Sequence, residues 1–180
     1  MRVVAGELRG RLFDAPPGMD TRPTTDKVRE AMFNALGSLD VIRDAVVADL
    51  FAGSGGLGIE ALSRGAAQVV FAERDRTALR TLRDNLRNLD LLDRSRVVQG
   101  DAVVAARSIT ADVVLADPPY DFDDWPALLA AVDAAFVVAE SGHPLDALDG
   151  LGELGWEITR SKRYGRTWVT FFERIDPDHG

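Results

Sequence analysis

The chain has 180 residues, 46% of them hydrophobic, which suits one globular domain with a full core and a small extension. It has no cysteine, which excludes disulfides, thiolate metal sites and a cysteine nucleophile, and its two histidines, His143 and His179, lie in a turn and in a polar tail. The formal net charge of -8 argues against general affinity for nucleic acid, so a nucleic-acid role requires a local basic surface.

The start of the chain narrows the possible locations of the protein. The first residues are polar and lack a long apolar stretch, so we expect neither a signal peptide nor a membrane span. A cytoplasmic location follows from this expectation. With no cysteine and only two peripheral histidines, we also expect no metal site.

The first 40 residues predict an N-terminal extension made of a hairpin and a helix, which precedes the main domain at residues 41–180. Two short strands, residues 2–6 and 10–13, flank a turn, and apolar residues recur at helical spacing from Asp26 to Leu36. The extension is rich in basic residues, which suit RNA phosphates, although mixed charge on a solvated helix explains the same pattern. The residues predicted to contact RNA are Arg9, Arg11, Arg22, Thr24, Lys27 and Arg29.

Residues 41–180 alternate between strands and helices. Asp75 is placed to cap a long helix, and Asp123 or Asp124 a later helix. The last two strands, residues 156–161 and 167–173, are close enough to form an antiparallel hairpin. Short apolar strands are predicted at residues 45–50, 68–72, 97–99, 112–116 and 135–139. The pattern predicts an α/β fold with a doubly wound, Rossmann-like sheet that is mostly parallel and carries the antiparallel hairpin at one edge.

Acidic residues mark four of the predicted strand ends. Asp49 precedes a glycine loop at residues 51–58, and Glu73, Asp101 and Asp117 mark three further ends. Ligands of open α/β sheets bind outside the carboxyl ends of the strands, so we expect these carboxylates to line one crevice. The glycines let the backbone approach a ligand closely and begin a helix whose amino end favours negative charge. Glu73 suits the hydroxyls of a ribose, and Asp101 suits the amino group of an adenine.

Two cofactors are compatible with such a crevice. Gly53, Gly55 and Gly58 satisfy Gly-x-Gly-x-x-Gly, the pattern of nicotinamide dinucleotide sites. However, a carboxylate at Asp49, just before the loop, suits a cationic ligand better than a pyrophosphate, and the chain has no room for the substrate domain of a dehydrogenase. The ligand that combines an adenosine, a ribose diol and a positive sulfonium is S-adenosylmethionine, which we predict as the cofactor. The alternative is that these acids are ordinary loop residues around an apolar core and hold no cofactor. That alternative has to explain why acids occur together at four predicted strand ends.

The stretch from Asp117 to Tyr120 ends a strand in two prolines and an aromatic ring. Each proline removes a backbone donor, and the first bars the helical region for Asp117, so the chain leaves the sheet in a rigid turn. Tyr120 is placed to stack on a planar base, while Asp117 and the carbonyl of Pro118 accept the hydrogens of an exocyclic amine. A proline turn with a solvated acid is the alternative interpretation.

Several segments, taken together, resemble one known family. Residues 49–55 and 57–66 resemble the cofactor loop of the RsmD family, bacterial 16S ribosomal RNA guanine-N(2) methyltransferases. The segment Thr21-Arg22-Pro23-Thr24-Thr25-Asp26 is more specific to that family than the glycine loop, which many methyltransferases share. Further segments follow in the family's order, at residues 2–11, 73–75, 100–102, 117–120 and 162–165. Two departures concern the RNA path: the acids Asp121, Asp123 and Asp124, and residues 150–155, which show no clear family pattern.

The resemblance implies an activity and a set of site residues. It implies methylation of the exocyclic 2-amino group of a guanine in 16S rRNA of the small ribosomal subunit, with S-adenosylmethionine as methyl donor. By position, the residues that hold the cofactor are Asp49, Phe51, Ala52, Gly53, Ser54, Gly55, Glu73, Arg74, Asp101 and Ala102. Those that hold the guanine are Asp117, Pro118, Pro119 and Tyr120. We expect a monomer that needs neither a metal nor a membrane.

Two other functions remain open from the sequence alone. The acid-proline-proline-aromatic turn serves any planar exocyclic amine, so an adenine 6-amino methyltransferase acting on DNA or RNA is the nearest alternative. Few residues remain for a DNA target-recognition domain, which disfavours the DNA version. The alternative from another class is a non-catalytic, nucleotide-binding Rossmann module, which predicts no methyl transfer and tolerance of Tyr120→Ala.

Overall fold

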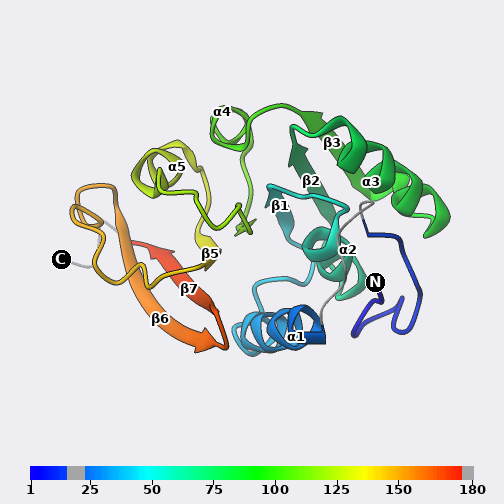
Figure 1. Cartoon of the computed structure of the whole chain (residues 1–180), viewed down its shortest axis with the longest axis horizontal. Coiled ribbons are helices and arrows are strands. Elements are labelled where there is room, and N and C mark those ends of the chain that lie inside the picture. Colours follow the sequence, from blue (N-terminus) through cyan, green and yellow to red (C-terminus); the bar gives the residue numbers. More distant parts are fainter. Residues whose placement is uncertain (16–22, 176–180) are drawn as a thin grey trace.

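The computed structural model describes residues 1–15 and 23–175, which form a seven-stranded sheet with helices on both faces (Figure 1). The strand order is β3-β2-β1-β4-β5-β7-β6, and pairing is parallel from β3 to β5 and antiparallel for β7 and β6. The strands are β1 (Val46–Leu50), β2 (Gln68–Glu73), β3 (Ser95–Gln99), β4 (Val113–Ala116), β5 (Phe136–Ser141), β6 (Trp156–Tyr164) and β7 (Thr167–Arg174). This confirms the predicted doubly wound sheet with an antiparallel edge hairpin.

Two layers of helices cover the sheet because side chains of a strand alternate between its faces. Val47 and Leu115 belong to the core shared with α1, α2 and α3, whereas Ala48 and Val114 belong to the core shared with α4 and α5. The helices are α1 (Pro23–Ser38), α2 (Gly56–Ser63), α3 (Arg76–Asn88), α4 (Ala102–Ala106) and α5 (Trp125–Ala131), with a 3-10 turn, η1 (Leu92–Arg94). No helix among residues 1–15 and 23–175 has the length and hydropathy needed to cross a membrane.

The register of the parallel strands brings their carboxyl ends to one edge. Leu50 is paired with Ala72 of β2 and with Ala116 of β4, and Ala116 is paired in turn with Ala139 of β5. The residues that close or follow these strands therefore emerge side by side. This edge carries the predicted acids of β1, β2 and β4, and it also carries Glu140 near the end of β5.

One of the two predicted acidic caps makes its capping hydrogen bonds, and the other does not. The Asp75 carboxylate accepts from the backbone N–H groups of Thr77 and Ala78 at the start of α3, as predicted. Asp101 does the same for α4. Asp124 occupies the N-cap position of α5, but its side chain makes no capping hydrogen bond, so the predicted capping is wrong there. Trp125 begins that helix, and Pro126, with its φ already fixed, follows it in the first turn.

The N-terminal residues form a loop that is docked on α2 instead of the predicted two-stranded hairpin. Arg2 and Leu12 make a single antiparallel bridge, with further backbone hydrogen bonds at both ends of the loop. The N–H groups of Val4 and Ala5 donate to the carboxylate of Glu60, at 2.8 and 3.0 Å, so they are not available for strand pairing. The helix that follows begins at Pro23, earlier than predicted, because proline is well suited to a first helical turn.

Glu60 is the side chain that ties this N-terminal loop to the domain. It is 1% exposed, and besides the two backbone groups it binds Arg64 at 2.8 Å and lies 3.8 Å from Nε of Arg29, which is 3% exposed. We predict that Glu60→Gln lowers the free energy of unfolding by about 3 kcal/mol, because it leaves buried guanidinium charge without its partner.

Urea unfolding monitored by circular dichroism measures this change. The matched control is Asp84→Asn, which breaks the Asp84–Arg87 pair, more than 60% exposed on both sides, and should cost less than about 1 kcal/mol. Equal costs for the two variants would show that Glu60 does not hold the N-terminal loop in place.

Candidate functional site

Asp49 lies at the centre of the strand edge and is 1% exposed. One carboxylate oxygen accepts from the N–H of Gly58 in α2 at 2.8 Å, which fixes the side chain beneath the glycine loop. Burial raises the pKa of Asp49 well above its usual value, and the nearby charges of Asp117 and Glu73 raise it further, while the hydrogen bond from Gly58 opposes them. A cation beside this carboxyl group would relieve the cost of ionising it.

The glycine loop between β1 and α2 has strained and tightly packed backbone. Phe51 has a φ of 63°, in the left-handed region that side chains other than glycine seldom adopt. Gly55 has a φ of 91°, and a Cβ there would lie 2.5 Å from Leu82. The ring of Phe51 packs edge-on against Phe122 at 5.1 Å, which ties the loop to the segment just after Tyr120.

A buried asparagine, which sequence reasoning did not find, supports the same loop. Asn85 of α3 is 1% exposed, and its amide donates to the carbonyls of Ser54 at 3.0 Å and Asp14 at 2.9 Å. Its oxygen accepts from the N–H of Asp14 at 2.8 Å. Asn85 therefore joins the glycine loop to the N-terminal loop. Its position in a helical stripe of leucines gives no local signal of this role.

Glu73 and Asp101 are fixed by backbone groups at neighbouring strand ends. Glu73 accepts from the N–H groups of Gly53, Arg74 and Asp75, at 2.7–2.8 Å. A carboxylate has about four lone-pair sites, so Glu73 retains room for about one more donor, fewer than the two ribose hydroxyls that we expected. Asp101 uses one oxygen to cap α4 and is exposed, as is Arg74, whereas Ala102 is buried.

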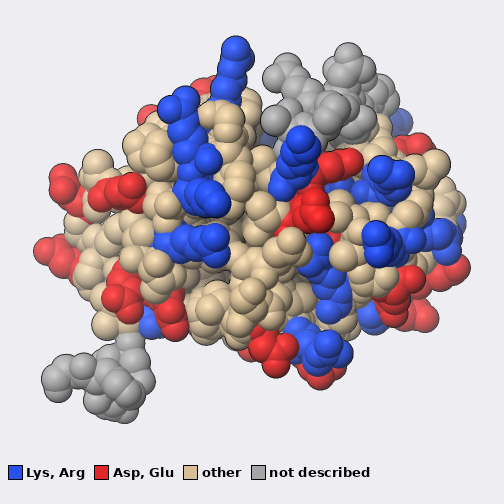
Figure 2. Space-filling view, turned by 90° about the horizontal axis from the view of Figure 1, so that it is seen from below, with Lys and Arg blue, Asp and Glu red and all other residues tan. Residues whose placement is uncertain are grey.

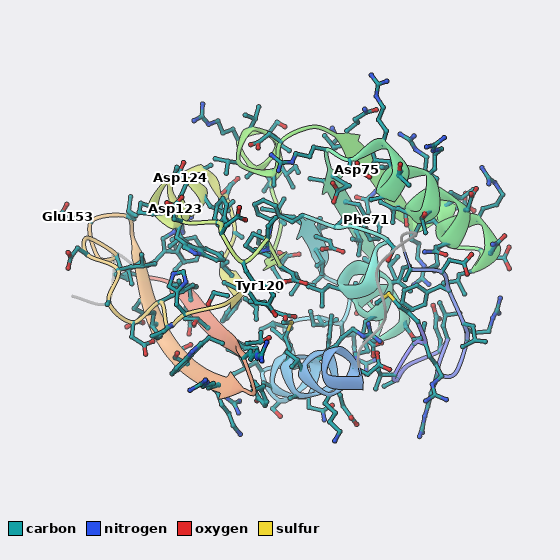
Figure 3. All side chains as sticks on the ribbon, viewed as in Figure 1. Phe71, Asp75, Tyr120, Asp123, Asp124 and Glu153 are labelled. Carbon is teal, nitrogen blue, oxygen red and sulfur yellow. The ribbon has the colours of Figure 1, made fainter. Side chains whose placement is uncertain are left out.

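The segment from Asp117 to Tyr120 follows β4 at the same edge. Pro118 is buried, whereas Tyr120 is 70% exposed and lies between α2 and the β6–β7 hairpin (Figure 3). Asp117 keeps an exposed surface, but the protein around it limits its hydration and raises the pKa to about 6. This combination places an acid, a free backbone carbonyl and an open aromatic face next to each other.

Glu140 is a further acid of the site. It directly follows the strand predicted at residues 135–139, and the sequence analysis did not include it among the site residues. It is 8% exposed and follows Ala139, the partner of Ala116, so it emerges beside Asp117. Burial raises the pKa of Glu140 well above its usual value, and the charges of Asp117 and Asp49 add to this, while Arg29 opposes it. An acid that closes an apolar strand beside another marked strand end is the signal that could have identified it.

The residues predicted to contact RNA divide into two groups. Arg9, Arg11 and Lys27 are exposed, and Arg9 and Lys27 line a cavity of ≈ 340 Å³ between the N-terminal loop and α1, apart from the strand edge. Arg29 is buried and donates to Asp26 at 2.8 Å and to the carbonyl of Arg2 at 2.7 Å, so its guanidinium is not placed for RNA phosphates. Arg22 and the side chain of Thr24 lie outside the described residues.

Two of the three acids that the sequence places beside the RNA path lie away from the exposed ring. Asp123 and Asp124 are exposed and sit over the start of α5, well separated from Tyr120 in Figure 3. Phe122, next to Asp123, points inward and packs on Trp125 at 5.1 Å. Asp123 and Asp124 therefore do not crowd the face of Tyr120, whereas Asp121, which is also exposed, directly follows it in the chain.

Comparisons with known proteins find relatives that match nearly the whole chain. A family model described as Conserved hypothetical protein 95 matches residues 1–173. The Ribosomal RNA small subunit methyltransferase D of Escherichia coli K12 is 43% identical over 97% of this chain and 90% of that protein. The Bacillus subtilis protein YlbH is 39% identical over 97% of this chain and 99% of that protein.

Solved structures extend the likeness to three dimensions. The Escherichia coli protein yhhF superposes with a TM-score of 0.82 at 33% identity, covering 97% of this chain and 98% of that one. A precorrin-6y C5,15-methyltransferase from Geobacter metallireducens has a TM-score of 0.65 at 19% identity, covering 91% and 94% of the two chains, and shares the fold alone.

The unfavourable burial of Glu140 generates a stability prediction. Because its folded-state pKa is raised, the carboxyl stabilises the fold when protonated and loses that contribution as the pH rises through its folded pKa. We predict that Glu140→Gln raises the free energy of unfolding at pH 7 by about 1 kcal/mol. The gain should disappear below pH 4.5, the ordinary pKa of a glutamate, where the carboxyl is protonated in both states.

Urea unfolding at pH 4, 5.5 and 7 measures the difference between the variant and the natural protein. Glu153→Gln is the control, because Glu153 is exposed in the loop before β6 and its substitution should change the free energy of unfolding by less than about 0.5 kcal/mol. A loss of stability for Glu140→Gln at pH 7 would mean that the Glu140 carboxylate is well paired, contrary to this account.

Proposed function

Because the chain belongs to the Conserved hypothetical protein 95 family, which includes ribosomal RNA small subunit methyltransferase D, we propose that it methylates 16S rRNA of the small ribosomal subunit from S-adenosylmethionine. The target that we propose is the exocyclic 2-amino group of a guanine. The observation that carries the proposal is the meeting of the Asp49 loop with Asp117 and the exposed ring of Tyr120 at one edge of the sheet. A cofactor and a planar base can therefore be held side by side.

The residues of this edge fit S-adenosylmethionine. Asp49, with its raised pKa, favours a cationic ligand at the glycine loop. The backbone of that loop, from Phe51 to Gly55, is fixed by the hydrogen bond that the N–H of Gly53 donates to the carboxylate of Glu73. The remaining acceptor capacity of Glu73 suits one ribose hydroxyl, and the free oxygen of Asp101 suits the adenine amino group. When bound, S-adenosylmethionine supplies a methyl group that is already activated as a sulfonium.

The turn after β4 is suited to present the guanine amine. The guanine, splayed out of its RNA loop, would stack on the face of Tyr120. Asp117 and the carbonyl of Pro118 would accept the two amine hydrogens and direct the nitrogen lone pair toward the glycine loop. Both acceptors stabilise positive charge that develops on the nitrogen, and Asp117 or water then holds the released proton.

The substrate and its base are tested by transfer of labelled methyl to small ribosomal subunits that lack the modification, followed by digestion to nucleosides. We expect label in N(2)-methylguanosine. Label in 6-methyladenosine would support the same cofactor site but show that the target base is adenine and not guanine. No label, with S-adenosylmethionine binding intact, would contradict methyl transfer to the small subunit and point to another substrate or to a binding module.

Tyr120 provides the platform for the base, and its contribution is measurable. We predict that Tyr120→Ala weakens productive RNA binding by about 1–3 kcal/mol, the usual range for loss of one base-aromatic stack. Tyr120→Phe keeps the ring and should retain most of the activity. Steady-state kinetics with small subunits give kcat/KM for both variants, and equal losses in the two would show that the hydroxyl, not the ring face, is what matters.

The raised pKa of Asp117 predicts a pH dependence. Ionised Asp117 stabilises the positive charge that develops on the amine nitrogen, and protonation removes its negative charge, so kcat/KM should fall about tenfold per pH unit below pH 6. Asp117→Asn should lower kcat/KM by roughly 10²–10⁴-fold and remove this inflection. A pH profile of kcat/KM from 5 to 8 measures both, and an unchanged inflection in Asp117→Asn would assign it to another group.

A further inference from the structure

The hairpin of β6 and β7 carries a basic cluster that the proposed chemistry does not use. Arg160, Lys162, Arg163 and Arg166 are all exposed, on a protein whose net charge is -8. Figure 2 shows the corresponding face, where basic side chains gather left of centre, in the part of the view that contains β6. We call Lys162, Arg163 and Arg166, which lie nearest the turn, the hairpin-tip cations.

These charges are not neutralised by neighbouring carboxylates. Within residues 1–15 and 23–175, none of the ion pairs involves the hairpin-tip cations. Lys162 lies over the ring of Tyr164 at 5.2 Å, and Nε of Arg163 donates to the carbonyl of Gly165 at 2.8 Å. The acids of the hairpin, Glu157 and Glu173, are paired in register at its other end. The tip therefore presents unshared positive charge to solvent.

The register places the tip at the edge that holds the candidate site. Glu140 of β5 is paired with Val169 of β7, and Val169 is paired with Lys162 of β6. Likewise, Ser141 of β5 is paired with Trp168 of β7, and Trp168 is paired with Arg163 of β6. Strands lie about 4.8 Å apart, so Lys162 is about 10 Å from Glu140 in the plane of the sheet.

Tyr120 lies on the side of the site that faces this hairpin. A methyl group added at Gly142, just after β5, would lie 2.9 Å from Cδ1 of Tyr120, so the ring rests on the segment that follows β5. β7 is the next strand of the sheet, and its first residue adjoins the turn that carries Arg166. A nucleotide stacked on Tyr120 would have its flanking backbone within reach of the tip.

We propose that Lys162, Arg163 and Arg166 bind phosphates of the RNA strand that carries the target nucleotide, on the side of the site opposite the N-terminal loop. The proposal rests on the proposed function, because it takes RNA as the partner. Unpaired cations near the base platform, on an otherwise acidic surface, supply the local positive charge that RNA binding requires. The exposed Arg9, Arg11 and Lys27 would contact the strand on the other side.

Salt dependence of binding separates phosphate contacts from other effects. Each phosphate contact adds about 0.7–0.9 to the slope of log K against log salt. We predict that Lys162→Gln, Arg163→Gln and Arg166→Gln combined lower the magnitude of this slope by about 2 for small ribosomal subunits between 50 and 200 mM KCl. In methyl-transfer kinetics, KM for the subunit should rise at least tenfold, with kcat changed less than about threefold.

The matched control removes the same number of charges from another exposed surface. Arg76→Gln, Arg80→Gln and Arg83→Gln on the outer face of α3 should leave the slope and KM unchanged. In both triple variants, the affinity for S-adenosylmethionine and the unfolding midpoint should equal those of the natural protein. An unchanged slope in the hairpin variant, or equal losses in both variants, would overturn the proposal.

The same experiment separates this proposal from the proposed function. If the natural protein methylates the subunit and the hairpin variant matches it in slope and KM, only the hairpin proposal fails. If the natural protein transfers no methyl to the subunit, the proposed function fails and takes this proposal with it. Binding of the tip to anionic lipid vesicles, with no effect of the variant on RNA, would also overturn it.

Discussion

The site depends on the crowding of three carboxyl groups at one edge of a parallel sheet. Asp49, Asp117 and Glu140 come together because the register of β1, β4 and β5 brings the strand ends level, and each group has a raised pKa that reflects its burial. Such an arrangement opposes stability at neutral pH. In the proposed function, the same carboxyl groups favour a cationic cofactor and accept the hydrogens of an amine, and their cost to stability is a consequence of that role.

Three contacts keep the loops around this edge in place. Glu60 binds the backbone of the N-terminal loop, Asn85 joins that loop to Ser54, and Phe51 packs on Phe122. The glycine loop, the N-terminal loop and the turn from Asp117 to Tyr120 are therefore parts of one packed unit. For a reaction in which positioning supplies most of the acceleration, this rigidity is a functional requirement.

The sequence predicted the features that depend on local signals, and failed where distant segments meet. The positions of the strands, the cap at Asp75 and the acids at four strand ends follow from patterns a few residues long. The pairing of the N-terminal strands is shorter than predicted because the N–H groups of Val4 and Ala5 donate to Glu60, more than 50 residues away. Arg29 is buried because packing turns that face of α1 toward Glu60, and Glu140 matters only through its register with β4.

The central claim, that the carboxyl groups of the strand edge are partly protonated and receive a cationic cofactor, can be tested by the protons exchanged on binding. Calorimetry of S-adenosylmethionine binding at pH 6, in buffers of different ionisation enthalpy, measures that number. A cation beside carboxyl groups of raised pKa lowers those pKa values, so the account predicts net release of protons. Binding with no proton release, or with proton uptake, would contradict it.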